Sequence, residues 1–332
     1  MKPFNINKLP DFDTISDAAK QLEGQSIQTG VLSSPWINAL IGAKVLFKCE
    51  NQQHIGAFKF RGAYNAISRL SKQQKQAGVI AYSSGNHAQA VARVCQMLEI
   101  EATIVMPDNA PIIKRQATES YGAIVVEYNP DTESRENIAE QINKEGQLSL
   151  IPPFNHPHII AGQGTAALEL MRDNPDISKL LAPCGGGGLL SGSVLAAKGI
   201  NSNCKVVGVE PALADDATQS FHQGKIVTID YPDTIADGTR TLCLGDITFA
   251  IIKEHVDAME TVSEAMIKEA VRIIFYHLKQ VVEPSGALGL AALLEDKVAG
   301  KTVAVDTIGI IMSGGNIDGQ TMSTILAESS MF

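Results

Sequence analysis

The chain has 332 residues, 45% of them hydrophobic and 19% charged, a composition typical of a globular protein with one large or two medium domains. The formal net charge of −9, without a block of lysine or arginine, argues against nucleic acid or an anionic membrane surface as the main partner. No stretch approaches the roughly 18 unbroken apolar residues of a membrane span, and the N-terminal residues lack the apolar centre of a secretion signal. We therefore expect a cytoplasmic protein that acts on a small molecule.

The cysteines indicate neither a disulfide framework nor a zinc site. They are five, an odd number, and they are scattered without a C-x-x-C pair: Cys49, Cys95, Cys184, Cys204 and Cys243. We expect them to behave as small buried hydrophobic residues.

Short apolar runs alternate with polar stretches of helical length through much of the chain. Between residues 79 and 152 the pattern predicts strands at 79–82, 103–106, 123–128 and 149–151, separated by helices at 88–98, 112–121 and 133–145. After residue 160 it predicts a helix at 165–172, strands at 180–182, 205–210 and 308–312, and a helix at 189–198. This alternation is typical of β-α-β units, so we expect an α/β fold with two units built on parallel sheets.

Polar segments directly follow four of these strands. They are SSGNH at 83–87, CGGGG at 184–188, Glu210, and SGGN at 313–316. In an open parallel sheet, the carboxyl ends of the strands form the edge where ligands bind. We therefore expect these segments, which are far apart in sequence, to converge on one site.

The four consecutive glycines at 185–188 are costly to order, which indicates that their backbone contacts a ligand, most often an anion. A nucleotide triphosphatase is excluded because no Lys-Ser or Lys-Thr follows them. A dinucleotide fold is a near miss: Leu190 or Ser191 replaces the last glycine of G-x-G-x-x-G, while Glu210 stands where a ribose-binding acid is expected. NAD thus stays open beside a third interpretation, a single phosphate monoester such as pyridoxal phosphate.

Pyridoxal phosphate also requires a lysine that bonds covalently to the cofactor. Lys59, in IGAFKFRGAYNAI at 55–67, is flanked by Phe58 and Phe60 ahead of a helical pattern. Aromatic neighbours restrict water and lower the pKa of a lysine, whereas a lone lysine in an apolar stretch is commonly a surface residue whose amine reaches solvent. These residues alone leave both interpretations open.

Four motifs occur in a fixed order along the chain: GAFKFRGA at 56–63, SSGNHAQAVA at 83–92, GGGG at 185–188 and SGGN at 313–316. Together they resemble the fold-type II pyridoxal-phosphate enzymes of the serine/threonine dehydratase family, and within it the serine racemases. The resemblance implies two doubly wound parallel-sheet domains with the active site in the cleft between them. The large domain would comprise residues 1–75 and 152–332, and a small mobile domain residues 76–151.

The resemblance implies that Lys59 binds pyridoxal phosphate and takes the α-proton of the substrate from one face, while Ser84 stands on the other face. A helix N-cap is the structural alternative for Ser84. Ser313 would face the pyridine nitrogen and leave it without a charged partner, which favours prompt loss of a leaving group over transamination. The remaining cofactor contacts would be Phe58, Asn86 at the 3-hydroxyl, and, around the phosphate, Gly185, Gly186, Gly187, Gly188 and Leu189.

The resemblance also implies contacts with the substrate and with a divalent cation. The substrate residues would be Ser83, Ser84, Asn86 and His87 around the carboxylate, together with Arg135 and Asn155. The cation would be held by the carboxylates of Glu210 and Asp216 and by the backbone carbonyl of Ala214, which are oxygen ligands suited to Mg²⁺, Ca²⁺ or Mn²⁺. A solvated acidic turn is the structural alternative for residues 209–216, and a solvated ion pair is the alternative for Arg135.

The implied activity is dehydration of a β-hydroxy-α-amino acid such as serine or threonine by a homodimer, with serine racemisation as a companion. The chain departs from the animal serine racemases at Arg240, where they carry serines after the ADG turn. An arginine there suits a second carboxylate, so 3-hydroxyaspartate is an alternative main substrate. A second departure is His54, near the place of an ATP-binding lysine, which leaves ATP binding open. A β-replacement synthase of the cysteine synthase type is the rival enzyme class.

Overall fold

The computed structural model describes residues 9–332 except 84, 111, 131, 145 and 302–306. The strands are β1 (Val31–Leu32), β2 (Lys44–Cys49), β3 (Val79–Tyr82), β4 (Ala102–Pro107), β5 (Ile124–Tyr128), β6 (Ser149–Leu150), β7 (Lys179–Pro183), β8 (Lys205–Pro211), β9 (Ala258–Val262) and β10 (Thr307–Met312). The helices are α1 (Phe12–Leu22), α2 (Pro35–Ile41), α3 (Lys59–Ser68), α4 (Lys72–Ala77), α5 (Asn86–Leu98), α6 (Ile112–Ser120), α7 (Arg135–Ile142), α8 (Pro157–Asp173), α9 (Gly188–Ile200), α10 (Asp216–Gln223), α11 (Asp246–His255), α12 (Glu264–Ile273), α13 (Leu288–Val298) and α14 (Gly319–Ala327).

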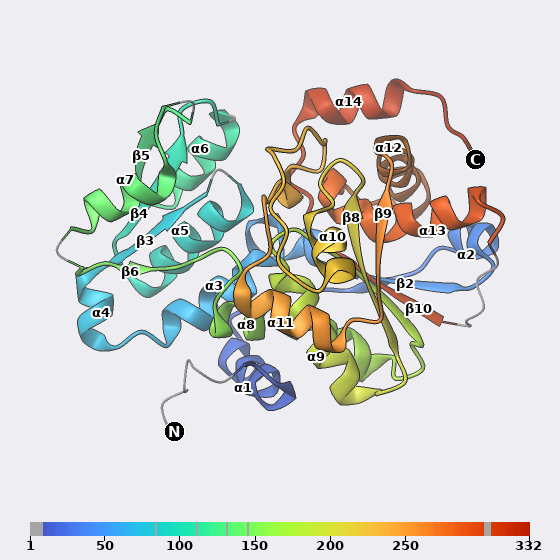
Figure 1. Cartoon of the computed structure of the whole chain (residues 1–332), viewed down its shortest axis with the longest axis horizontal. Coiled ribbons are helices and arrows are strands. Elements are labelled where there is room, and N and C mark those ends of the chain that lie inside the picture. Colours follow the sequence, from blue (N-terminus) through green and yellow to red (C-terminus); the bar gives the residue numbers. More distant parts are fainter. Residues whose placement is uncertain (1–8, 84, 111, 131, 145, 302–306) are drawn as a thin grey trace.

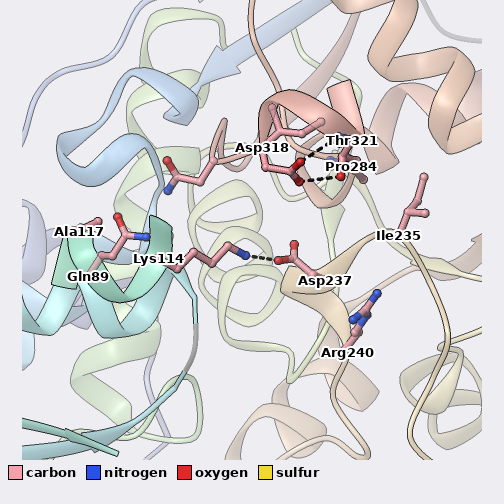
Figure 2. A pocket seen from close by; sticks show the side chains of 11 residues that line it. Gln89, Lys114, Ala117, Ile235, Asp237, Arg240, Pro284, Asp318 and Thr321 are labelled. Atoms are coloured by element: carbon pink, nitrogen blue, oxygen red, sulfur yellow. Dashed lines mark hydrogen bonds and ion pairs between the residues drawn. The ribbon is translucent and has the colours of Figure 1, made fainter. Parts of the chain in front are cut away.

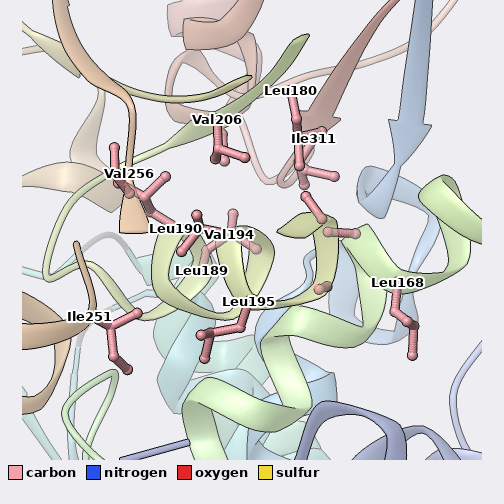
Figure 3. Close-up of a cluster of buried hydrophobic side chains, with 14 of the residues drawn as sticks. Leu168, Leu180, Leu189, Leu190, Val194, Leu195, Val206, Ile251, Val256 and Ile311 are labelled. Carbon is pink, nitrogen blue, oxygen red and sulfur yellow. The ribbon is translucent and has the colours of Figure 1, made fainter. Parts of the chain in front are cut away.

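Figure 1 shows two bodies, each built on one sheet. The sheet of the larger body has six strands in the order β1-β2-β10-β7-β8-β9, and all neighbours are parallel except β1 and β2. Helices cover both faces, so every residue of β10 is buried. The core with α8 and α9 appears in Figure 3, where Leu168, Leu190 and Val194 share one cluster with Leu180 and Ile311 of the sheet.

The smaller body (residues 79–150) is built on four parallel strands in the order β5-β4-β3-β6. Helix α5, together with α3, buries one face of this sheet, with Val91 and Val94 clustered with Ile104. Helix α7 covers the other face, where Ala139 clusters with Ile80. The predicted fold of two parallel α/β units is therefore confirmed.

Each strand predicted from the sequence is present with small shifts at its ends, but β1, β2 and β9 were not predicted, and α8 begins at Pro157 instead of residue 165. The early part of α8 contains Gly162 and Gly164, which weaken helix propensity. A Cβ on Gly162 would lie 2.5 Å from the Arg61 carbonyl oxygen, and one on Gly164 would lie 2.6 Å from that of Gly192. The two glycines let α8 pack backbone to backbone against α3 and α9, and this packing outweighs local propensity.

The fold brings the predicted polar segments together. Strands β10, β7 and β8 are neighbours, so the segments after them lie along one sheet edge. The backbone before α3 joins this edge, because Ala57 bridges Gly314 and the Phe58 N–H donates to the Ser313 carbonyl at 3.0 Å. All five cysteines are free, and four of them are buried. Within the part of the chain that the structure describes, no helix has the length and apolar character needed to cross a bilayer.

Candidate active site

Lys59 is the first residue of α3, and its side chain is half-buried. Its Nζ donates to the Pro153 carbonyl at 2.9 Å and lies 5.2 Å from the centre of the Phe58 ring. Phe58 is anchored in turn by its backbone hydrogen bond to Ser313, which is itself buried. The amine is thus held at the carboxyl edge of the larger sheet.

A buried ion network anchors the first turn of α3. The guanidinium of Arg61 is fully buried and pairs with Glu50 at 2.7 Å and with Glu169 at 2.6 Å. Lys48, also buried, pairs with Glu169 at 2.6 Å. Two cations and two anions therefore compensate one another, and they tie the helix that carries Lys59 to the end of β2 and to α8.

Burial lowers the pKa of Lys59 to about 8, although the charge of the nearby Glu283 carboxylate opposes the shift. Burial and the charge of Lys59 together lower the pKa of His87, in the first turn of α5, to about 3. His87 is therefore neutral, and because the Ile151 carbonyl at 2.9 Å can only accept, its Nε2 carries the proton. The pKa of Lys59, in contrast, lies near neutral pH, which is a property suited to a general base.

Asn86, the first residue of α5, is fixed from two sides. Its Nδ2 donates to Glu283 at 2.8 Å, and its Oδ1 accepts from Asn316 at 2.8 Å. Asn316 also donates to the Ile55 carbonyl at 2.7 Å. Burial, with the charge of Asp237, raises the pKa of Glu283 to about 8. This chain of hydrogen bonds joins the smaller body to the larger one beside the SGGN segment.

The glycine run leads directly into α9, a helix of 13 residues, and Gly187 takes a φ of 85°, which favours glycine. Among the described residues, no oxygen accepts a hydrogen bond from the N–H groups of Gly185, Gly186 and Gly188. These N–H groups and the positive end of the helix dipole form a cradle that fits a phosphate. Leu189 follows in the first helical turn and is buried.

Packing explains why side chains are absent from this loop. A Cβ on Gly186 would lie 2.3 Å from the ring of Phe154, and one on Gly188 would lie 3.0 Å from the Phe154 Cβ. A Cβ on Gly185 would lie 3.0 Å from the Cα of Thr239. The loop is therefore pressed against Phe154 and against the turn at 237–239.

Glu210, in β8, and Asp216, at the start of α10, form a buried acidic pair. Glu210 accepts hydrogen bonds from Thr218, whereas neither carboxylate oxygen of Asp216 has a partner among the described residues. Burial raises the pKa of Asp216 to about 7 and, with the charge of Asp216, raises that of Glu210 well above its usual range. Ala214 is buried on the same turn.

This donor set suits a divalent cation, since two carboxylates and a carbonyl are oxygen ligands and no other side chain or backbone group of the described residues is a hydrogen-bond partner of the Asp216 oxygens. No group of three or more His, Cys, Asp or Glu side chains able to hold a metal occurs in the described residues. The metal site therefore stays a prediction.

Two predicted substrate residues have other partners. Asn155 uses both atoms of its amide to hold the start of α11, with Nδ2 donating to Asp246 at 2.6 Å and Oδ1 accepting from the Ile247 N–H at 3.1 Å. The guanidinium of Arg240 donates through Nε to the Thr234 carbonyl at 2.8 Å. Arg240 also lines a cavity of about 390 Å³ whose walls come from both bodies, as Figure 2 shows.

The other predicted substrate residues lie in the smaller body. The hydroxyl of Ser83 accepts from the Gly85 N–H at 3.2 Å. Ser84 lies outside the described residues, and Arg135 begins α7 with a side chain that is not described. The roles assigned to these three residues stay predictions.

Comparison with known proteins identifies the family. Residues 22–314 match the family described as pyridoxal-phosphate dependent enzyme. The chain belongs to this family. It is 46% identical over 321 residues to L-threo-3-hydroxyaspartate ammonia-lyase of Saccharomyces cerevisiae, covering 96% of this chain and 97% of the relative. It is 46% identical over 322 residues to the serine racemase of Schizosaccharomyces pombe, with coverage of 96% and 98%. The solved structure of maize serine racemase matches with a TM-score of 0.91 at 41% identity, covering 96% of this chain and 97% of that one.

Family membership decides between the two phosphate-bearing ligands that the glycine run left open. The cofactor is pyridoxal phosphate and not NAD. The expected class, a pyridoxal-phosphate enzyme of the serine/threonine dehydratase kind, is confirmed. Within the described residues, the N–H groups of Gly185, Gly186 and Gly188 have no acceptor, and with the half-buried Lys59 amine they fit the phosphate and the aldehyde of this cofactor.

Sequence reasoning did not assign roles to Glu283, Phe154, Pro153 or Asn316. A signal existed for Glu283, because it is the only charged residue in the run VVEPSGALGLAALL at 281–294. An acid in such a run is buried and needs a partner. Phe154 and Pro153 act through their contacts with the glycine loop and Lys59, and no sequence pattern shows such contacts.

Proposed function

We propose that this enzyme removes water from a β-hydroxy-α-amino acid, such as serine, threonine or 3-hydroxyaspartate, and releases a 2-oxo acid and ammonia, with serine racemisation as a companion activity. The carrying observation is the Lys59 amine, whose pKa is about 8. Two adjacent residues link it to the phosphate cradle, since Pro153 accepts its hydrogen bond and Phe154 packs on Gly186. Relatives at 46% identity are named for ammonia-lyase and racemase activities.

Bound pyridoxal phosphate supplies an electron-withdrawing ring that stabilises negative charge at the substrate α-carbon. Lys59 removes the α-proton, for which a pKa near the working pH is suited. The N–H groups of the glycine loop hold the phosphate, and Asn86, fixed by Glu283 and Asn316, offers a rigid polar contact. The β-hydroxyl takes up a proton and departs as water. A second water then replaces the nitrogen, which gives ammonia and the 2-oxo acid.

Ser313 directs the reaction toward elimination. It is buried and uncharged, and we propose that its hydroxyl faces the pyridine nitrogen. A hydroxyl is too weak an acid to share a positive charge with the ring, so prompt loss of the β-hydroxyl is favoured over transamination.

Racemisation needs a second proton-carrying group on the opposite face of the substrate, and we propose Ser84 for it. The substrate carboxylate would be bound at the start of α5, around Ser83, Asn86 and His87, because the N-terminus of a 13-residue helix attracts an anion. Arg135 and Asn155 complete the proposed contacts. Asn155 would have to release Asp246 to reach a substrate.

A divalent cation, Mg²⁺ or alternatively Ca²⁺ or Mn²⁺, is proposed at Glu210, Asp216 and the Ala214 carbonyl. The support is the pair of buried Asp216 oxygens that lack partners among the described residues. The cation would compensate two buried carboxylates that otherwise repel each other.

A second candidate is 3-hydroxyaspartate ammonia-lyase as the main activity, and the observation that favours it is Arg240. Its guanidinium lines the cavity, bonds the Thr234 carbonyl and has no carboxylate partner among the described residues. Such a group is suited to bind the second carboxylate of 3-hydroxyaspartate.

The test is the initial rate of 2-oxo acid formation from L-serine, L-threonine and L-threo-3-hydroxyaspartate, measured side by side in the presence of Mg²⁺. The Lys59→Ala variant serves as the inactive control. Chiral analysis of recovered serine tests racemisation. If Arg240 binds the second carboxylate, Arg240→Ala should lower the rate with hydroxyaspartate and leave the rate with serine unchanged. An unchanged ratio of the hydroxyaspartate rate to the serine rate would mean that Arg240 has a structural role. No 2-oxo acid from any substrate would refute the proposal, and turnover only with added thiol would identify a β-replacement synthase.

We further propose a cytoplasmic homodimer in which the small domain, residues 76–151, moves relative to the remainder. Light scattering tests the dimer. ATP binding stays open: His54 packs against the ring of Phe60 with centroids 4.5 Å apart, and burial lowers its pKa. Rates measured with and without ATP decide it.

A further inference from the structure

One ion pair joins the two bodies within the described residues. Lys114, on α6 of the smaller body, pairs with the carboxylate of Asp237 in the larger body. Figure 2 shows the two side chains pointing toward each other across the cavity, with Gln89 and Ala117 on the side of Lys114 and Arg240 on the side of Asp237. Both side chains are partly shielded, with exposed fractions of 15% for Lys114 and 37% for Asp237.

Asp237 belongs to a turn that rests on the glycine loop. The next residue, Gly238, donates its N–H to the Ser285 hydroxyl at 2.9 Å. Thr239 lies against Gly185, as the 3.0 Å approach of its Cα to a Cβ placed there demonstrates. The turn that carries Asp237 therefore lies directly against the backbone of the glycine loop.

Lys114 and Asp237 also act on the polar chain beside Lys59. The charge of Asp237 raises the pKa of Glu283, and the charge of Lys114 lowers it, so both groups lie within electrostatic range of that carboxyl. Glu283 holds Asn86, which begins α5 in the smaller body. The ion pair thus acts electrostatically on Glu283, the residue through which the larger body holds Asn86 of the smaller body.

We propose that Lys114 and Asp237 are positioning residues that hold the smaller body closed over the bound substrate. This inference rests on the proposed function for its kinetic test, but not for its structural test. The pair touches no reacting atom, so its loss weakens substrate retention more than the chemical step.

The expected size follows from the exposure of the pair. Exposed ion pairs contribute a factor of about 1.4 to 5 in an equilibrium constant, and this partly shielded pair falls at the upper end of that range. Lys114→Met should therefore raise KM roughly threefold to fivefold and change kcat less.

The neighbouring residue supplies a matched control. Arg115 lies on the same helix and pairs with Glu127 inside the smaller body, so Arg115→Met removes an ion pair without touching the contact between the bodies. Lys114→Asp combined with Asp237→Lys reverses the pair and should restore it. Rescue would show that the attraction between the two side chains, and not either side chain alone, carries the effect.

The experiment compares the wild-type holoenzyme with Lys114→Met, Arg115→Met and the charge-reversed double variant. Amide hydrogen exchange over residues 112–120 and 236–241, the two sides of the cavity, is measured without substrate, and KM and kcat are measured with the best substrate. We expect faster exchange on both sides and a raised KM in Lys114→Met alone, and recovery of both in the double variant.

The proposal is overturned if Lys114→Met and Arg115→Met show the same exchange on the two sides of the cavity. It is also overturned if the wild type is active and Lys114→Met has the same KM as the wild type. An inactive wild type would instead refute the proposed function, and the hydrogen exchange would still decide whether the ion pair holds the bodies together.

Discussion

The reactivity of Lys59 gives the sharpest test of the site. In the cofactor-free protein, burial lowers the pKa of its amine from 10.5 to about 8. Only the uncharged amine attacks the aldehyde of pyridoxal phosphate, so the rate of cofactor capture should rise with pH and level off above about 8. An ordinary surface lysine would still be gaining rate well beyond that pH.

The shift from 10.5 to about 8 corresponds to about 3.4 kcal/mol of preference for the uncharged form, at about 1.36 kcal/mol per unit. At about pH 7.5 an amine with the lowered pKa is roughly 24% uncharged, against about 0.1% for an ordinary lysine. Capture should therefore be up to about 240 times faster than by an unperturbed amine of equal access. This figure is an upper bound, because water still reaches a half-buried side chain.

The assay is stopped-flow mixing of cofactor-free enzyme with pyridoxal phosphate, following the yellow absorbance across pH, with Lys59→Ala as the baseline. Glu283→Gln separates charge from burial: the Glu283 carboxylate stabilises the ammonium form, so its removal should move the midpoint to lower pH. A wild-type midpoint near 10.5, or an upward shift in Glu283→Gln, would refute this account of Lys59.

Gly186→Ala should weaken cofactor binding and lower the free energy of unfolding by about 1–3 kcal/mol, because its methyl group meets the Phe154 ring. Adding Phe154→Leu should restore part of both quantities, which are measured by cofactor titration and by urea unfolding. Arg61→Leu should cost about 3–5 kcal/mol in urea unfolding, since two carboxylates lose a buried partner, and a cost below about 1 kcal/mol would contradict the network. Excess EDTA should lower the melting temperature, Mg²⁺ should restore it, and Asp216→Asn should remove the response. An unchanged melting curve in EDTA would count against the cation.

The sequence predicted β7, β8 and β10 because burial on both faces is a local property of an apolar run. It did not predict β2, KVLFKC, which carries lysines near both ends. Lys48 is tolerated inside the protein because Glu169, on α8, neutralises it at 2.6 Å. That partner lies far away in the sequence, so no window centred on β2 contains the information. The short edge strand β9 has a similarly weak local signal.

The residues of the candidate site also fall into those that a local motif reveals and those whose role depends on a distant partner. Lys59 and Asn86 were found because their motifs surround them in sequence. Glu283 was missed, since its importance depends on Asn86, a residue 197 positions away. Asn155 was predicted to contact substrate, and in the structure it holds the start of α11. A motif specifies which residues stand near a site, whereas the hydrogen-bond partner of each follows only from the folded chain.

Residues 151–155 connect the smaller body to the larger one, and their contacts explain why closure of the smaller body and proton transfer should respond differently to mutation. Here the chain returns from β6 to α8, and consecutive prolines at 152 and 153 restrict its backbone. The Pro153 carbonyl holds the Lys59 amine, and Phe154 supports the glycine loop. The Lys59 amine and one side of the glycine loop are thus held by a stiff segment that contains neither Lys114 nor Asp237. Loss of that ion pair should loosen the smaller body and leave the Lys59 amine in place, which is why we expect a larger effect on KM than on kcat.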